Sequence, residues 1–178
     1  RFMTSKRYSR RHVLGLSLGR AAAPAPGPWT ARDSADMPAP DPAVHLLSRA
    51  AFGPSAADLA HVRAIGTTAW IDAQIEWASI DASAVEDALI GGLPTLSMSA
   101  NDLSQLVPRT FHFPDALNAA MFYRQTFSPR QLHEVMVDFW SDHFSIYQLQ
   151  EGVDWYKTVD DRDVIRPHAL GRFKDLLS

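Results

Sequence analysis

Helix start and stop signals alternate from Asp41 to Gly92, and this succession constrains the fold more than any other feature of the sequence. Asp and Ser cap the free N–H groups of a helix start, whereas Gly and Gly-Pro pairs end helices. The expected starts and stops are Asp41-Pro42, Gly53-Pro54, Ser55 with Asp58, Gly66, either Thr67 or Thr68, and Gly91-Gly92. The spacing of these signals predicts several short helices connected by tight turns.

The rest of the chain adds helices and no strands. Further helices are expected from Asp115, from Ser128 and around Ala169–Leu177, and the stretch Leu93–Pro114 has little helical pattern and is interpreted as an irregular connection. No convincing alternating strand pattern or hairpin turn is present. The sequence therefore predicts an all-α fold, an irregular multi-helix array that is truncated at its C-terminus.

The segment Phe127–Phe144, FSPRQLHEVMVDFWSDHF, carries the strongest helix signal. Ser128 is a natural N-cap, Pro129 suits the first helical position, and Gln131 completes a capping box. Glu134, Asp138 and Asp142 follow at intervals of four residues, which predicts a solvated acidic flank or, alternatively, carboxylates that share a cation.

Candidate metal ligands are present without a recognised motif. They are Asp138, Asp142, His143 and Asp154. The acidic stretch VDDRD, residues 159–163, lacks the glycine and the distal glutamate of a calcium-binding loop, and a solvated turn or helix start is the simpler interpretation. The sequence identifies no cofactor.

Polar groups that are costly to bury mark a second candidate site. Trp140, His143, Arg166 and His168 need hydrogen-bond partners if they lie in the interior. They fit either a buried polar network that fixes helix positions or a ligand-binding or catalytic site. In the catalytic interpretation His143, His168, Asp142 and Arg166 are the candidate residues.

Charge and composition exclude several classes of protein. All 20 acidic residues lie at or after Asp33, and seven of the 17 Lys and Arg residues precede it. The remainder therefore has ten basic and 20 acidic side chains, which argues against binding of nucleic acid. No run is long enough to span a membrane, and the absence of cysteine excludes disulfides and thiolate sites.

The N-terminus has the features of an export signal. Arg10-Arg11, followed by a weakly apolar stretch and small residues, resembles the twin-arginine motif. The chain is thus divided into a signal at residues 1–25, a Pro/Ala-rich linker at 26–40 and a helical domain at 41–178. The expected location is periplasmic or extracellular, with the twin-arginine machinery as a partner; the alternative is a cytoplasmic protein with a basic tail.

Three blocks resemble the N-terminal part of the large bacterial family called domain of unknown function 1800. They are His45–Ile75, Val135–Ile146 and Val164–Leu177. The matching motif positions are Arg49, Phe52 and Gly53, then Phe139, Trp140, His143 and Phe144, then Arg166, Pro167, His168, Gly171 and Phe173. The resemblance implies a helical, often exported protein of which this chain is an N-terminal fragment, and it transfers no catalytic role.

Three functions are compatible with these observations. An exported hydrolase, metal-dependent or not, would use His143 and His168 and requires them to converge in one cleft. A binding or assembly module for an envelope protein or polymer requires a groove lined with exposed aromatic residues such as Trp155 and Tyr156, and no titratable cluster. A structural scaffold requires the same polar residues to be buried and mutually satisfied. We expect the second or the third.

Overall fold

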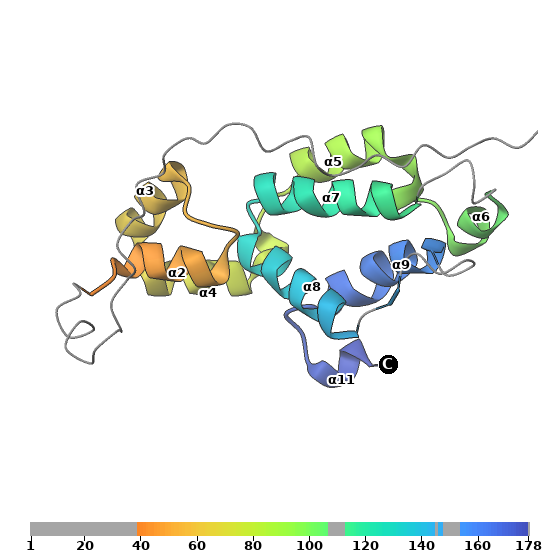
Figure 1. The fold of residues 1–178 in the computed structure, drawn as a ribbon. Helices are drawn as coiled ribbons and strands as arrows, with labels where there is room; N and C mark the ends of the chain where they lie inside the picture. The colour runs from red at the N-terminus through yellow and green to blue at the C-terminus, as the bar shows by residue number, and fades with distance from the viewer. Residues whose placement is uncertain (1–38, 107–112, 145, 148–153, 178) are drawn as a thin grey trace, which may run out of the picture. The chain divides into compact units, whose positions relative to one another are not determined.

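A computed structural model describes residues 39–106, 113–144, 146–147 and 154–177 (Figure 1). Every regular element in these ranges is helical and none is a strand, which confirms the all-α fold. No described helix combines the length and the apolar character needed to cross a membrane. The predicted export signal and nearly all of the predicted linker lie outside the described residues, so the domain division stays a prediction.

The first three helices of the described residues begin and end at the predicted signals. They are α2 (Pro42–Ala50), α3 (Ala56–Ile65) and α4 (Thr67–Ile75). The Asp41 carboxylate accepts a hydrogen bond from the Ala43 N–H at 2.8 Å, and Ser55 Oγ accepts one from the Asp58 N–H at 3.0 Å. Gly66 has a φ of 88°, which a residue with a side chain rarely adopts, so it ends α3 and reverses the chain into α4.

The next segment is more helical than predicted. After the short 3₁₀ turn η1 (Trp77–Ser79), helix α5 (Ser83–Gly92) continues through both glycines that were expected to end it. The stretch interpreted as irregular contains the 3₁₀ turn η2 (Pro94–Leu96) and helix α6 (Ala100–Gln105). Ser99 caps α6 in the same way that Ser55 caps α3, a signal that the sequence interpretation missed.

Helices α7 (Phe113–Phe127) and α8 (Gln131–Phe144) meet at a sharp corner, residues 128–130. The Ser128 N–H donates to Arg124 O at 2.8 Å, so it is not available for the predicted capping box. The Gln131 side chain instead donates to Ser128 O at 2.8 Å, and Ser128 Oγ accepts from the Arg130 N–H at 3.1 Å. The helix therefore begins at Gln131, three residues after the predicted N-cap.

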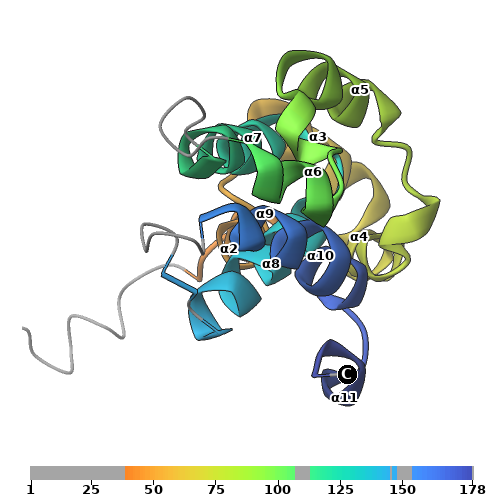
Figure 2. The same cartoon turned by 90° about the vertical axis from the view of Figure 1, so that its right-hand side faces the viewer.

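The last part of the domain is a continuous helix with an irregular middle. Helix α9 (Asp154–Asp160) runs through the π-turn η3 (Asp161–Ile165) into α10 (Arg166–His168). The predicted helix over Ala169–Leu177 is wrong in its first half, because the chain turns after His168 and only α11 (Phe173–Leu176) is helical (Figure 2). The VDDRD stretch, residues 159–163, is not a solvated turn, because it spans the end of α9 and the first part of η3.

Three small hydrophobic clusters form the core. The clusters join α2, α3 and α4; α5, η2 and α7; and α8, η3 and α11. Their buried members are Ala43, Leu47, Ala51, Val62 and Trp70 in the first, Val85, Leu89, Leu96, Leu117 and Ala120 in the second, and Val137, Ile165, Ala169 and Leu176 in the third. Because each cluster is small, the contacts between them determine how the helices are held together.

Polar side chains connect the α7–α8 corner to α4 and to the segment that follows η1. The Gln74 amide of α4 donates to Pro129 O at 2.9 Å and accepts from the Leu132 N–H at 3.1 Å. The Arg130 guanidinium donates twice to Ile80 O, at 2.8 and 2.6 Å. These bonds give backbone groups of the corner and of Ile80 side-chain partners, and they hold the corner against α4 and against the segment that follows η1.

Candidate functional site

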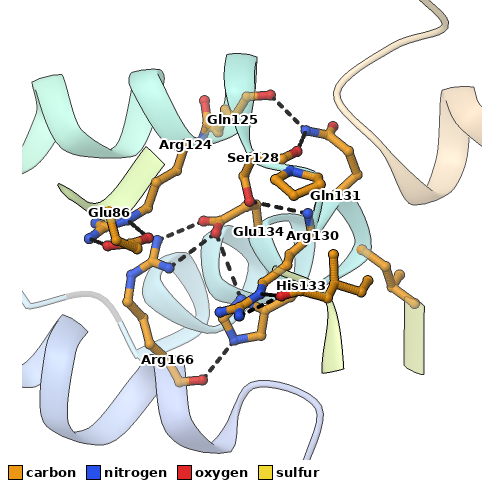
Figure 3. A network of polar contacts seen from close by, with 12 residues as sticks. Glu86, Arg124, Gln125, Ser128, Arg130, Gln131, His133, Glu134 and Arg166 are labelled. Atoms are coloured by element: carbon orange, nitrogen blue, oxygen red, sulfur yellow. Dashed lines mark hydrogen bonds and ion pairs between the residues drawn. The ribbon is translucent and has the colours of Figure 1, made fainter. Parts of the chain in front are cut away.

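A buried ion-pair network lies at the start of α8 (Figure 3). Glu134 accepts two hydrogen bonds from the guanidinium of Arg166, at 3.2 and 2.6 Å, and Arg166 also donates to Asp161 at 3.0 Å. The side chains of Glu134 and Asp161 are each 4% exposed. A second bidentate pair, between Arg124 and Glu86 at 2.9 and 2.7 Å, joins α7 to α5 beside it.

The charges of the network stabilise one another. Burial alone raises the pKa of the Glu134 carboxyl, but attraction to the imidazole of His133 and the bonds and charge of Arg166 more than offset it, so the pKa falls from 4.5 to about 2. Burial lowers the pKa of Arg166, but the negative charges of Asp161 and Glu134 raise it by more, so the net change is an increase. Glu134 and Arg166 are therefore both charged at neutral pH.

The π-turn explains how Asp161 and Arg166 meet. In a regular α-helix, residues five apart point about 140° away from each other. Here the Arg166 N–H donates to Asp161 O, five residues back, and the wider turn brings the two side chains to the same side. Pro167 is the sequence signal for this distortion, because it has no N–H and its ring would clash with the carbonyl of Asp163.

An aromatic contact closes the other side of the network. The imidazole of His133, which is 2% exposed, stacks on the indole of Trp77 with ring centroids 4.0 Å apart. Its Nε2 donates to Arg166 O at 2.8 Å, and its Nδ1 lies 3.8 Å from Glu134 Oε1 without a hydrogen bond. Neither Trp77 nor His133 was a predicted site residue, and their partners come from distant parts of the chain, so no local pattern could identify them.

The prediction of a solvated acidic flank is wrong for Glu134. The contacts of Arg166, in turn, fit a structural role. Glu134 was grouped with Asp138 and Asp142 on a solvated surface, yet Arg166 draws it into the interior. Because the Arg166 guanidinium is paired with two carboxylates, its geometry fits a role in fixing the positions of the helices. Trp140 behaves similarly, because its indole N–H donates to Ala169 O at 2.9 Å and ties α8 to the end of α10.

His143, Asp138 and Asp142 lie together, although the site they form is shallow. They line a hollow of about 490 Å³ on α8 with Val135 and Phe139. Burial and the charge of Asp142 raise the pKa of the Asp138 carboxyl, and a hydrogen bond from Gln125 offsets part of this effect. His143 is exposed and lies edge-on against Trp140 and Phe144, two rings that pack against the third hydrophobic cluster.

The remaining predicted site residues do not join this hollow. His168 on α10 is half-buried and is not among the residues that line it. The side chain of Asp154 and both arginines of the export motif, Arg10 and Arg11, lie outside the described residues. Within the described part of the chain, no group of three or more His, Asp or Glu residues is arranged to hold a metal ion, so the metal assignment stays a prediction.

A two-lobed cleft is the larger concave feature. It lies between the start of α3, helix α4 and the α7–α8 corner, with lobes of about 540 and 570 Å³, a size typical of ligand-binding pockets. Both lobes share Ser55, Asp58, Thr126 and Gln131. Phe52, Gly53, Pro54 and Gln125 complete the first lobe, and His61, Trp70, Ala73, Gln74, Ile80, Phe127, Ser128 and Pro129 complete the second.

The walls of this corner cleft are rigid and nearly uncharged. Asp58 and His61 are the ionisable residues among those that line it. The Gln131 carbonyl oxygen accepts from the Phe52 N–H at 3.1 Å, and Gln74 bridges α4 to the corner. None of the cleft residues was a predicted site residue, although Phe52 and Gly53 were among the motif positions. The cleft therefore has the character of a binding groove rather than of an acid–base site.

A family model described as "Protein of unknown function (DUF1800)" matches residues 45–178. The match begins at His45 within α2 and includes every later described element up to α11, and with them the network, the α8 hollow and the corner cleft. No curated protein and no solved structure matches the chain.

Proposed function

The chain belongs to the family of proteins of unknown function called DUF1800, and membership supplies no activity. From the geometry we propose that residues 40–178 are a helical binding module whose ligand lies in the corner cleft. One observation carries the proposal: a preformed two-lobed groove with exposed aromatic rings contains no cluster of titratable groups. That combination is the one expected of a binding or assembly module.

The buried network is the scaffold of the proposed module. Arg166 connects α10 to α8 through Glu134, and Arg124 connects α7 to α5 through Glu86. Apolar residues of the same shape could stabilise the fold as well as such a pair, but removal of one charged partner is costly, and in this proposal the pairs specify one arrangement of the helices they join. In this proposal they keep the corner, and hence one wall of the cleft, at a fixed position.

The location belongs to the same proposal. The Arg10-Arg11 pair and the small residues after it support transport by the twin-arginine machinery to the periplasm or beyond. That route carries proteins that are already folded. The ligand would then be a component of the cell envelope, either a protein or a polymer.

An exported hydrolase is the alternative proposal. It is supported by the α8 hollow, where His143 and Asp142 lie together and could act as a base and its partner. His168 is not part of that lining, so the hydrolase would need a further catalytic group from elsewhere. We favour the binding module for this reason.

A substitution that fills the second lobe of the corner cleft tests the proposed binding site. Ala73 is an exposed residue of α4 that lines the second lobe, so Ala73→Trp fills the lobe without changing a buried side chain. Ala69 is an exposed alanine one turn earlier that does not line the cleft, and Ala69→Trp is the matched control. The full-length protein is mixed with insoluble envelope material of the producing cells, and the bound fraction is measured by sedimentation.

We expect the wild type and Ala69→Trp to sediment with the envelope material and Ala73→Trp to remain in solution. Thermal unfolding of the three proteins verifies that each variant is folded. Equal sedimentation of both variants, or no sedimentation of the wild type, would overturn the assignment of the corner cleft as the binding site.

A further inference from the structure

We infer that the ligand of the corner cleft is a neutral polysaccharide chain, with one sugar ring in each lobe. This inference rests on the proposed function and adds the chemical class of the ligand. It is carried by the charge of the cleft, by its exposed aromatic rings and by the polar atoms that its own hydrogen bonds leave free.

The charge of the cleft disfavours ionic ligands. Asp58 lies where the two lobes meet, and no Lys or Arg is among the lining residues. A phosphate, sulfate or uronate group would therefore meet a carboxylate without a balancing cation. A single carboxylate is also too little to hold a strongly basic partner at physiological ionic strength. A ligand without net charge fits this lining best.

The usual modes of peptide recognition do not fit either. An extended peptide adds to the edge of a sheet, and the described residues contain no strand. An amphipathic helix needs a continuous apolar groove, whereas hydroxyl and amide side chains from Ser55, Thr126 and Gln131 occupy the junction of the two lobes. Recognition of a phosphorylated motif needs clustered arginines, which the lining lacks.

Each lobe offers one exposed aromatic ring. Phe52 lines the first lobe and is 42% exposed, and Phe127 lines the second and is 60% exposed. The C–H face of a pyranose packs on the face of such a ring, because C–H bonds carry a small positive charge and the ring face a negative one. Two platforms separated by a polar junction suit two sugar units of one chain.

Free polar atoms at the junction and in each lobe complement sugar hydroxyls. Ser55 Oγ donates to Asp58 Oδ2, which leaves Oδ1 as an acceptor. Gln125 donates through Nε2 to Asp138 at 3.2 Å, so its carbonyl oxygen is also an available acceptor. The exposed imidazole of His61 adds a donor. Hydroxyl groups both donate and accept, and so can use all three.

The cleft does not need to form on binding. The amides of Gln74 and Gln131 are already bonded to backbone atoms of the opposite wall, which fixes both walls before a ligand arrives. Little conformational entropy is then lost on binding, and this allows a ligand with few apolar contacts to bind measurably.

The test uses soluble neutral oligosaccharides of glucose and of N-acetylglucosamine, in series of increasing length, with a uronic acid polymer as the charged comparison. Binding to the full-length protein is measured by titration calorimetry. Phe127→Ala removes the platform of the second lobe, and Phe122→Ala is the matched control, because Phe122 is 69% exposed on the same helix but does not line the cleft.

We expect a neutral oligosaccharide to bind from the disaccharide upward, Phe127→Ala to weaken binding about tenfold, and Phe122→Ala to leave it unchanged. Equal affinities of the two variants, or preference for the acidic polymer, would overturn the inference. If no oligosaccharide binds while sedimentation with envelope material still depends on Ala73, the ligand belongs to another class and only the inference fails. If sedimentation is also absent, both proposals fail.

Discussion

Replacing Glu134 by Gln tests the physical basis of the scaffold. The substitution keeps the shape of the side chain but removes the negative charge that faces Arg166 in the interior. The pKa of Glu134 is lowered from 4.5 to about 2, and each unit corresponds to about 1.4 kcal/mol, so the charged form contributes about 3 kcal/mol to folding at neutral pH. Loss of one member of a buried pair typically costs a similar amount, about 3–5 kcal/mol.

The pH dependence gives this prediction a distinct signature. Because the folded-state pKa lies below the unfolded-state value, the contribution is fully present above pH 4.5 and is lost as pH falls toward 2. The free energy of unfolding is measured by urea titration of wild type and Glu134→Gln at several values of pH. The difference between them should be about 3 kcal/mol at pH 7 and less than half of that by about pH 3.

A matched substitution separates this effect from a general one. Glu76 is exposed and its side chain makes no hydrogen bond or ion pair within the described part of the chain, so Glu76→Gln should change the free energy of unfolding by less than about 0.5 kcal/mol. If Glu134→Gln behaves like Glu76→Gln, or if its effect does not diminish in acid, the ion pair does not hold the helices together in the way we describe.

Three other substitutions address single contacts. Gln74→Met should lower the free energy of unfolding by about 2 kcal/mol in urea titration, because two buried hydrogen bonds to the corner are lost, and a change below about 0.5 kcal/mol would contradict this. Trp140→Phe should cost about 1–2 kcal/mol by the same assay, since Ala169 O loses its donor; unchanged stability would refute the bond. Asp142→Asn should lower the pKa of Asp138 in a carboxyl NMR titration, and an unaltered titration would show that the charge of Asp142 is not felt there.

Local chemistry made the boundaries of α2, α3 and α4 predictable. Asp41, Ser55 and Gly66 act on atoms within a few residues of themselves, so their roles can be inferred from neighbouring sequence alone. The all-α fold follows from the same signals together with the absence of strand patterns. Where such a signal was overlooked, as at Ser99, the helix after it was missed too.

The candidate site depends on contacts between distant residues, and sequence patterns do not record them. Glu134 occupies the same helical register as the more exposed Asp138 and Asp142, and what buries it is Arg166, which lies 32 residues away. The pairing of Arg166 with Asp161 needs a π-turn that the sequence indicates only through Pro167. The corner cleft is assembled from three separate segments, so no local motif could predict it.

The most direct test of the proposed binding site is hydrogen–deuterium exchange of the full-length protein with and without the neutral oligosaccharide that binds best. We predict slower exchange of backbone amides around the corner cleft, in residues 52–61, 70–74 and 125–131, with no change along residues 135–143. Protection confined to residues 135–143, which surround the α8 hollow, would contradict the cleft assignment and favour the hydrolase instead.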